Sequence, residues 1–400
     1  KQTFLAIKLC EKSAKLTSTS GSLGQLVYVE PNTDYVLSAW VKGTGIIGVK
    51  MGQQLVFEKQ DNAKSWKEVE VAFNSGQFQQ IAVFAQFNGK KSLFDDFSIA
   101  REKGEQDAVI RLGTGGLSPD FPPGRNFDLN GWYLNTPESG ANGRSRRISE
   151  RQLVQGYEDR NYFYTGEDGG MVFRATVSGS KTSKNTKYTR TELREMLRRG
   201  DTSISTRNED KSPNKNNWVF SSAPRKARKA AGGVDGTLKA TLAVNHVTTT
   251  GEAHDIGRVI IGQIHASSDE PIRLHYRKLP YNERGSIYAA HEISGGDDQW
   301  YEILGSRSDT ATNPVDGIAL NEKFSYEIVA KGNELKVSIS KKGVLIGSTV
   351  IDMTNSGYDV AKDYMYFKAG VYNQNDSGEP DDYDQATFYS LENSHQGYEY

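Results

Sequence analysis

Cysteine is almost absent from this chain, because Cys10 is the single cysteine among 400 residues. One thiol excludes an internal disulfide framework and a zinc site built from several cysteines. Apolar runs of about twenty residues, the length that spans a membrane as a helix, are also missing. The chain starts at Lys1 without an initiator methionine, so we expect a soluble product that has been processed or truncated.

Proline and net charge are low as well. The chain has 11 prolines against 40 glycines and a net charge of −1. This composition predicts a folded, turn-rich chain that favours strands, and no global field that would recruit a polyanion. The 20 tyrosines stand out, since a phenol ring suits both a sheet surface and the stacking of a sugar.

The length predicts two domains, and residues 1–102 form the first. Short alternating runs at 25–29, 35–41, 69–73 and 81–87 are separated by turn signals at Pro31-Asn32-Thr33 and Asn88-Gly89. They predict a small β-sandwich. Residues 31–41 and 94–99 resemble the jelly-roll carbohydrate-binding modules that accompany polysaccharide-degrading enzymes. The alternative is a generic β-sandwich spacer.

A linker without periodicity, residues 103–124, leads into a second domain over residues 125–400. Strands are predicted at 172–177, 238–247, 258–265, 272–276, 287–292, 324–330, 334–340 and 349–352. Many short strands without a long amphipathic helix indicate an all-β fold, a larger sandwich or jelly roll. Two polar stretches, 178–187 and 198–236, interrupt it. The second contains the basic run 225–229, which is either a solvated loop or a contact for an anionic chain.

The most informative stretch is 366–374, because its side chains alternate with a period of two. One set, apolar apart from its last member, consists of Phe367, Ala369, Val371 and Asn373; the other consists of Tyr366, Lys368, Gly370, Tyr372 and Gln374. We expect the second set to form an outer face with a side-chain-free gap at Gly370, where a ligand approaches the backbone. An ordinary amphipathic strand is the alternative.

Two further segments share this pattern. In 258–265, Gln263 and His265 project from one face while Ile264 points away. In 188–197 a strand places Tyr188, Arg190, Glu192 and Arg194 on one face. Local propensity alone makes 191–199 resemble a short capped helix. We predict a strand because its neighbours are all β.

If the three strands lie side by side, their polar residues form one cationic, amide-bearing site with a histidine and tyrosines. No pair of acidic residues suggests glycoside hydrolysis, and no nucleophile elbow or phosphate-binding loop is present. Such a set fits proton abstraction next to a carboxylate.

The three segments resemble the signature motifs of polysaccharide lyase family 7, the alginate lyases. Residues 190–194 read Arg-Thr-Glu-Leu-Arg, residues 263–265 read Gln-Ile-His, and 366–374 read Tyr-Phe-Lys-Ala-Gly-Val-Tyr-Asn-Gln, all in the family's order. Residues 126–134 resemble the opening of the family's domain. The resemblance implies a β-jelly roll whose concave sheet forms the substrate groove.

The resemblance also implies the site residues. Arg190, Gln263 and His265 match the groups that neutralise the uronate carboxylate, and Tyr372 matches the catalytic tyrosine. With guluronate, His265 is implied as the base and Tyr372 as the acid; with mannuronate, Tyr372 serves as both. The substrate-binding residues implied or placed on the same face are Glu192, Arg194, Lys368, Gln374, Tyr188 and Tyr366, with Glu192 holding the arginines.

Two further expectations follow from the resemblance. Isoleucine at position 264 goes with acceptance of guluronate blocks. As a base, Tyr372 needs a lowered pKa, for which Arg190 and Lys368 are the source.

Taken together, we predict a secreted, monomeric alginate lyase that binds alginate, needs no metal or cofactor, and interacts with neither nucleic acid nor membrane. A lectin-like uronate binder and a lyase for another polyuronate, such as glucuronan, remain alternatives. The sequence does not distinguish internal from terminal cleavage.

Overall fold

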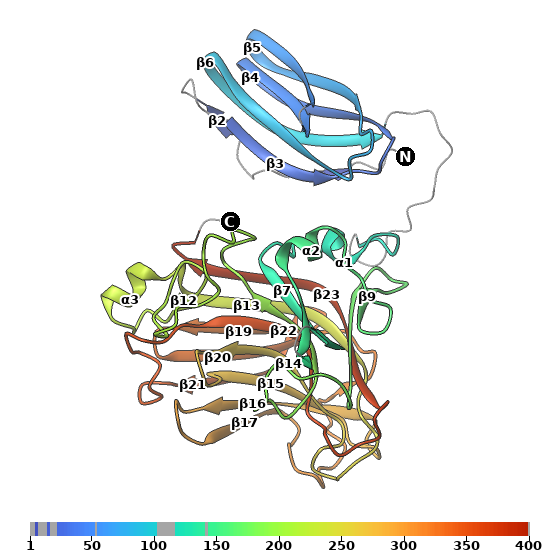
Figure 1. Cartoon of the computed structure of the whole chain (residues 1–400), viewed down its shortest axis with the longest axis vertical. Helices are drawn as coiled ribbons and strands as arrows, with labels where there is room; N and C mark the ends of the chain where they lie inside the picture. The colour runs from blue at the N-terminus through green and yellow to red at the C-terminus, as the bar shows by residue number, and fades with distance from the viewer. Residues whose placement is uncertain are drawn as a thin grey trace. The chain divides into compact units, whose positions relative to one another are not determined.

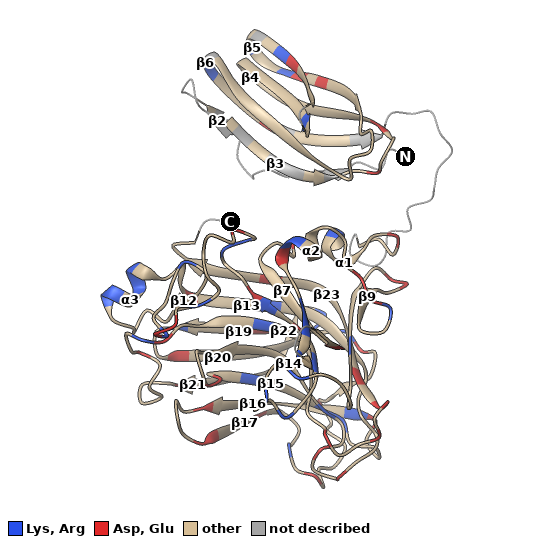
Figure 2. Cartoon of the chain, in the orientation of Figure 1, with Lys and Arg blue, Asp and Glu red and all other residues tan. Residues whose placement is uncertain are grey.

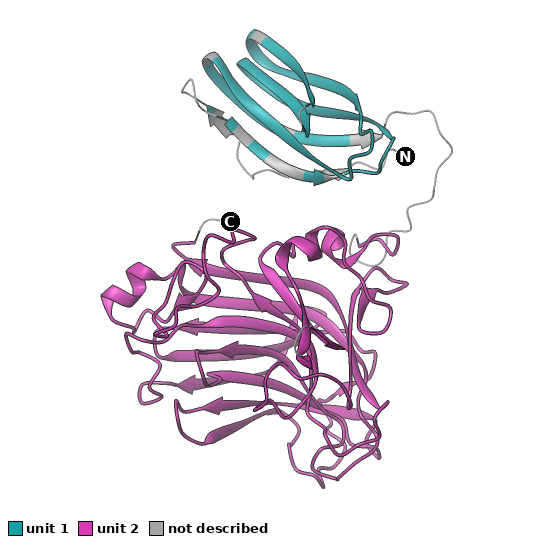
Figure 3. Ribbon diagram, viewed as in Figure 1, with its two compact units in different colours: residues 1–108 teal, residues 109–400 magenta. Residues whose placement is uncertain are grey.

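The structure of the protein is a computed structural model that describes residues 5–6, 14–16, 22–52, 54–101, 117–140 and 143–398. The chain divides into two compact units, residues 1–108 and 109–400 (Figure 3). Cys10 and residues 103–116 of the predicted linker lie outside the described residues. Leu117, which we had placed in the linker, is 8% exposed and packs in the core of the second unit. That unit therefore begins before residue 125.

The first unit is a six-stranded antiparallel sheet (Figure 1). Its strands are β1 (Leu5–Ala6), β2 (Ala14–Leu16), β3 (Ser22–Tyr28), β4 (Asp34–Met51), β5 (Gln54–Asn74) and β6 (Gln80–Arg101). The four predicted runs overlap β3 to β6. Alternate residues of β4, such as Leu37, Ala39 and Val41, are fully buried in the unit's core.

The predicted turn at Asn88 and Gly89 is wrong, because both residues lie inside β6. The pairing of β6 with β4 shifts register there: Gly43 pairs with Ser92, while Gly45 pairs with Phe87. The extra residues of β6 are accommodated as an irregularity in the ladder, which is what a β-bulge does. The turn-forming residues therefore interrupt the pairing without ending the strand.

The second unit contains two sheets. The nine-stranded sheet runs in the order β17 (Asp298–Leu304), β16 (Arg284–Glu292), β15 (Ile272–Arg277), β14 (Arg258–His265), β22 (Tyr366–Asn373), β11 (Arg190–Glu195), β7 (Trp132–Ser139) and β8 (Ser145–Ile148), with β18 (Ile318–Ala319) pairing to β16. The eight-stranded sheet runs β21 (Val344–Asp352), β20 (Glu334–Lys341), β19 (Phe324–Lys331), β13 (Gly233–His246), β23 (Tyr383–Gln396), β10 (Met171–Thr176) and β9 (Phe163–Thr165), with β12 (Trp218–Val219) parallel to β13.

Every predicted strand of this unit is present, and residues 190–195 form a strand as predicted. β17, β23 and the short strands β8, β9, β12 and β18 were not among the predicted strands. In β23 the apolar alternation is diluted by polar residues, among which Asp384 is fully buried. Three short helices, α1 (Pro123–Asn126), α2 (Glu150–Val154) and α3 (Arg225–Ala230), complete the described part, in which no helix is long and apolar enough to cross a membrane.

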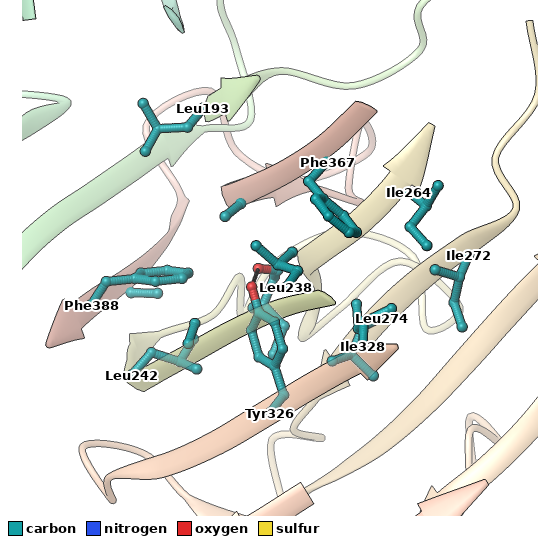
Figure 4. Close-up of a cluster of buried hydrophobic side chains, with 14 of the residues drawn as sticks. Leu193, Leu238, Leu242, Ile264, Ile272, Leu274, Tyr326, Ile328, Phe367 and Phe388 are labelled. Atoms are coloured by element: carbon teal, nitrogen blue, oxygen red, sulfur yellow. Dashed lines mark hydrogen bonds between the residues drawn. The ribbon is translucent and has the colours of Figure 1, made fainter. Parts of the chain in front are cut away.

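One apolar core joins the two sheets (Figure 4). Ile264 and Phe367 enter it from the nine-stranded sheet, and Leu238 and Tyr326 enter it from the other. Burying each such side chain contributes about 1.5–3 kcal/mol. The Tyr326 hydroxyl donates to the Ile261 carbonyl at 3.1 Å and thereby links the two sheets with a hydrogen bond.

The strand β22 alternates as predicted, with Phe367, Ala369 and Val371 in the core. The interpretation of Gly370 as a gap for a ligand is wrong. Its φ of +138° disfavours other residues, and a Cβ at this position would lie 2.7 Å from the Thr191 carbonyl oxygen and 3.1 Å from the Phe173 ring. Glycine is therefore required by the backbone and the packing.

A buried carboxylate ties four strands together. Glu195 accepts hydrogen bonds from Trp218 Nε1 at 3.0 Å, the Phe367 amide at 3.0 Å, His395 Nε2 at 2.7 Å and the Asn393 amide. The other nitrogen of His395 lies 2.6 Å from a backbone carbonyl. The imidazole of His395 is therefore held between Glu195 and the backbone of β13.

We therefore expect Glu195→Gln to destabilise the second unit by about 1–3 kcal/mol, because an NH2 group in place of one carboxylate oxygen leaves buried donors without their acceptor. Urea unfolding followed by tryptophan fluorescence measures this change. Glu327→Gln, at an exposed pair with Lys239, is the control and should change the free energy of unfolding by less than about 0.5 kcal/mol. Equal stabilities of the two variants would show that Glu195 does not stabilise the second unit.

Candidate active site

Three neighbouring strands carry the predicted site residues. β11 pairs with β22, and β22 pairs with β14. In this register Arg190 lies opposite Tyr372, and Lys368 lies opposite both Arg194 and Gln263. Because directly paired residues share one side of a sheet, the structure brings the three motifs together. We call this side of the nine-stranded sheet the polar face.

Glu192 lies among these residues and is 1% exposed. Its Oε2 accepts a hydrogen bond from Arg190 Nη1 at 3.0 Å and another from the Lys368 ammonium, while its Oε1 accepts one from the Gln263 amide. Hydrogen bonds to a carboxylate are stronger than those between neutral groups. One buried carboxylate therefore fixes a guanidinium, an ammonium and an amide.

Arg194 has different neighbours from those we expected, because it contacts aromatic rings and not Glu192. Its guanidinium carbon lies 3.8 Å from the centre of the Tyr366 ring. The imidazole of His265 stacks on the same tyrosine at 5.0 Å, with 16° between the planes. Since β11 and β14 flank β22, the two contacts come from the strands on either side of Tyr366. This stack orients His265.

Lys368 is 6% exposed. Its burial, reinforced by the charge of Arg190, lowers its pKa to about 8, although Glu192 acts to raise it. Lys368 is therefore charged at pH 7 and loses its charge in mildly alkaline solution.

Tyr372 lies beneath Arg190, whose guanidinium carbon is 3.6 Å from the centre of the phenol ring. The ring of Tyr188 meets it edge-on at 6.2 Å. Burial raises the pKa of Tyr372, and the opposing effect of Arg190 does not overcome it. Arg190 acts to lower this pKa as expected, but desolvation of the phenolate is the larger effect, so the pKa is not lowered as a base role for Tyr372 would require. Tyr372 is therefore a neutral phenol that can donate a proton.

His265 presents one nitrogen as a base. Its Nδ1 lies 2.6 Å from the Ala266 carbonyl oxygen, which only accepts, so Nδ1 carries a proton, and the lowered pKa of the ring leaves Nε2 with the lone pair at neutral pH. Burial lowers the pKa of His265 to about 4, with Lys368 and Arg190 acting in the same direction and Glu270 against them. The ring is neutral at pH 7, as a general base must be.

Glu270 is a site residue that the sequence analysis missed. Its Oε1 lies 3.0 Å from His265 Nε2, so a proton taken up by that nitrogen would be held between the two groups. Arg273 contacts Glu270, at 3.9 Å, and Glu292, at 3.6 Å. Burial, reinforced by Glu270, raises the pKa of Glu292 to about 7. The signal for Glu270 was weak, because it precedes β15 and belongs to no alternating pattern.

The two remaining predicted residues lie at the edges of this arrangement. Tyr188 precedes β11 and contacts the site through its ring contact with Tyr372. Gln374 follows β22, and its amide donates to the Asn373 carbonyl at 2.8 Å.

Other features of the described residues lie apart from this site. No group of three or more metal-ligating side chains is found among them. A cavity of about 300 Å³, lined by Trp132, Leu197 and Tyr398 among others, includes none of the predicted site residues.

Comparisons with known proteins agree on one family. A family model described as "Alginate lyase" matches residues 127–395. An alginate lyase of Klebsiella pneumoniae is 54% identical over 283 residues, which are 68% of this chain and 91% of that protein. The crystal structure of the alginate lyase from Klebsiella pneumoniae matches with a TM-score of 0.66 at 54% identity, covering 68% of this chain and 98% of the other.

A more distant structure shares the fold alone. The exolytic family 7 alginate lyase AlyA5 from Zobellia galactanivorans is 22% identical, with a TM-score of 0.52, over 68% of this chain and 98% of its own. The predicted all-β, jelly-roll class of the second unit is thereby confirmed.

The shared carboxylate predicts how Lys368 titrates. In Glu192→Gln we expect the pKa of Lys368 to fall below about 8, because the carboxylate that raises it is gone. A ¹³C NMR titration of labelled lysine side chains measures this pKa. Glu327→Gln, which removes the partner of Lys239, should leave it unchanged. An unchanged or higher pKa in folded Glu192→Gln would show that Glu192 does not set the charge of Lys368.

Proposed function

The chain belongs to the alginate lyases of polysaccharide lyase family 7, and from this membership we propose the roles of its residues in β-elimination and its preference for guluronate. The protein is an alginate lyase, which cleaves 1,4-linked uronate chains and leaves a 4,5-unsaturated sugar. The observation that carries the proposal is the single face on which Glu192 holds Arg190, Lys368 and Gln263 beside His265 and Tyr372.

The first task is to neutralise the substrate carboxylate, because the C5 proton is barely acidic while that group keeps its full charge. Arg190 and Gln263 supply donors for this task. Arg190 Nε has no hydrogen-bond partner within the described part of the chain. Donors fixed beforehand favour the charge that develops in the transition state, and the loss of one typically costs about 3–4 kcal/mol.

The elimination then moves two protons. His265 Nε2 takes the proton from C5, the electron pair forms the C4–C5 double bond, and the C4–oxygen bond breaks. The hydroxyl of Tyr372 gives its proton to the departing oxygen. The lowered pKa of His265 and the raised pKa of Tyr372 support these roles at neutral pH.

These protonation states also support guluronate as the preferred substrate. With guluronate the proton and the leaving oxygen lie on opposite sides of the ring, so a separate base and acid are needed. With mannuronate they lie on one side, and Tyr372 would have to ionise first. Because burial raises the pKa of that phenol, the route through His265 is favoured.

We expect Tyr372→Phe to lower kcat on poly-guluronate by about 10²–10⁴-fold, because the leaving oxygen loses its acid. Substrate binding should persist, since the ring still packs beneath Arg190. Initial rates from the ultraviolet absorbance of the unsaturated product, with binding measured by calorimetry, separate the two effects. Tyr188→Phe is the control, because it removes a neighbouring phenol hydroxyl and leaves Tyr372 in place as the acid. Near-normal turnover by Tyr372→Phe would show that Tyr372 is not the acid that protonates the leaving oxygen.

Ile264 influences specificity from within the core. Its side chain is fully buried among Ile272, Leu274 and other apolar residues, on the side away from the polar face (Figure 4). It therefore cannot touch a sugar. Its size sets the position of β14 and with it the placement of Gln263 and His265, one residue away on either side.

Ile264→Val should lower the free energy of unfolding by about 0.5–1.5 kcal/mol. It should also reduce the ratio of poly-guluronate to poly-mannuronate activity, because β14 repacks. Parallel rate measurements on the two polymers test this. Ile272→Val, another core truncation on β15, is the matched control. The same ratio in both variants and the unaltered protein would contradict a role for Ile264.

We propose that the first unit binds carbohydrate. We also propose that the protein acts outside the cell, because alginate is a polymer too large to enter a cell intact. Trp40 supports binding, because 40% of its surface is exposed on a sheet face where it pairs with Glu68 on β5 and Asp95 on β6. An exposed indole beside hydrogen-bonding side chains suits the stacking of a sugar ring.

Trp40→Ala should reduce the retardation of the full-length protein in native gels that contain an immobilised polysaccharide. Gels with alginate and gels with neutral glucans are run separately. Phe78→Ala, at an exposed aromatic residue in a turn, controls for the loss of an apolar surface. A protein that no polysaccharide retards, or equal retardation of Trp40→Ala, would favour a spacer.

A further inference from the structure

The basic run at 225–229 is a helix and not a loop. Residues Arg225, Lys226, Arg228 and Lys229 lie on α3, where Figure 2 shows basic residues gathered. All four side chains are exposed. This concentration of charge contrasts with the chain as a whole, whose net charge is −1.

Packing holds the helix in one orientation. Ala227 is 3% exposed and lies in a small apolar cluster with Val219, Ala223 and Ala231. Successive residues of a helix are rotated by about 100°, so Arg225 and Lys229 point away from this cluster, while Lys226 and Arg228 lie on the two exposed flanks of the helix. The four cations are therefore displayed together on the outer side of α3.

A fifth cation closes the end of the helix. Lys215 Nζ donates to the Ala231 carbonyl at 2.6 Å and to the Lys229 carbonyl at 3.2 Å. These carbonyls lie at the C-terminal end, where a helix leaves acceptors without partners and a cation is favoured. The ammonium of Lys215 thereby adds to the positive surface, which we call the α3 patch: Arg225, Lys226, Arg228, Lys229 and Lys215.

The α3 patch lacks counter-charges. None of its five cations forms a salt bridge with a carboxylate of the described residues, whereas other exposed cations do, such as Arg146 with Glu138 and Lys239 with Glu327. Several unpaired like charges repel one another, and this repulsion is relieved when an anion binds. The α3 patch is therefore suited to a polyanion.

The α3 patch is connected to the strand β22 through the chain, but the patch does not lie on the polar face. α3 follows β12, whose Trp218 pairs with Met365, the residue before Tyr366. The helix is thus anchored near the start of β22 through the core, and none of its cations contacts a residue of the site.

We propose that the α3 patch is a second binding site for alginate, which holds a stretch of the polymer outside the polar face. The inference rests on alginate as the substrate. Each sugar of this polymer carries one carboxylate, so a continuous chain matches a row of cations. Contact at a second point raises the effective concentration of the same chain at the catalytic strands. Exposed charges are screened by salt, with a Debye length of about 10 Å at 0.1 M.

The test compares two variants of equal charge in the full-length protein. The first combines Arg225→Gln, Lys226→Gln and Lys229→Gln. The control combines Lys331→Gln, Lys336→Gln and Lys342→Gln, which are exposed lysines on β19, on β20 and in the turn after it, and which likewise have no salt bridge among the described residues. Initial rates are measured on long alginate and on an alginate tetrasaccharide, each at low and at high salt.

For long alginate at low salt we expect the α3 variant to raise KM about 3- to 10-fold with kcat unchanged, and the control to change neither. The difference should vanish at high salt, where the charges are screened, and should be absent with the tetrasaccharide, which is too short to reach both sites. An unchanged KM for the polymer, or the same increase with the tetrasaccharide or in the control, would overturn the proposal. Activity of the unaltered protein on the tetrasaccharide depends on the polar face alone. If the unaltered protein did not cleave the tetrasaccharide, the result would contradict the proposed function and not the role of the α3 patch.

Discussion

The buried carboxylate of Glu192 is the interaction on which the active site depends. It lies on β11 and accepts hydrogen bonds from Arg190 on the same strand, from Lys368 on the neighbouring strand β22 and from Gln263 on β14, the strand beyond. Without it, two cations would lie close together in a poorly solvated place, which is costly unless they are paired. The carboxylate makes that concentration of positive charge possible, and the substrate carboxylate then meets donors already in position.

Residues on one side of strand β11 contribute to the active site, and residues on its other side stabilise the fold. Arg190, Glu192 and Arg194 belong to the polar face. On the opposite side, Leu193 enters the apolar core and Glu195 binds groups from β12, β22 and β23. The backbone amide of Phe367, one residue before Lys368, is among these groups. The strand that carries the lysine and the tyrosine is therefore positioned from both sides of β11, and a small shift in the core would be felt on the polar face.

Period-two alternation made most of this arrangement predictable. It assigned Phe367, Ala369 and Val371 to the core and Lys368 and Tyr372 to the outer face, and the family resemblance implied that the three motifs share one groove. Alternation could not reveal effects that depend on three-dimensional surroundings. The role of Gly370 comes from the backbone of β11 and the ring of Phe173. The pKa of Tyr372 depends on how deeply the ring is buried, and Glu270 reaches His265 from outside any regular strand. The helical form of residues 225–230 depends on where Ala227 can be buried, and the basic run gives no sign of that.

The central claim is that burial sets the protonation states of this face: a neutral imidazole, a neutral phenol and a charged lysine. The pH dependence of kcat/KM on poly-guluronate, followed by the ultraviolet absorbance of the unsaturated product, tests it most directly, because this quantity reports the free enzyme. The account predicts that the rate rises through about pH 4 as His265 loses its proton, stays level through neutral pH, and falls above about 8 as Lys368 loses its charge. A rate that keeps rising from pH 8 toward about 10, as a phenol acting as the base would require, would contradict it.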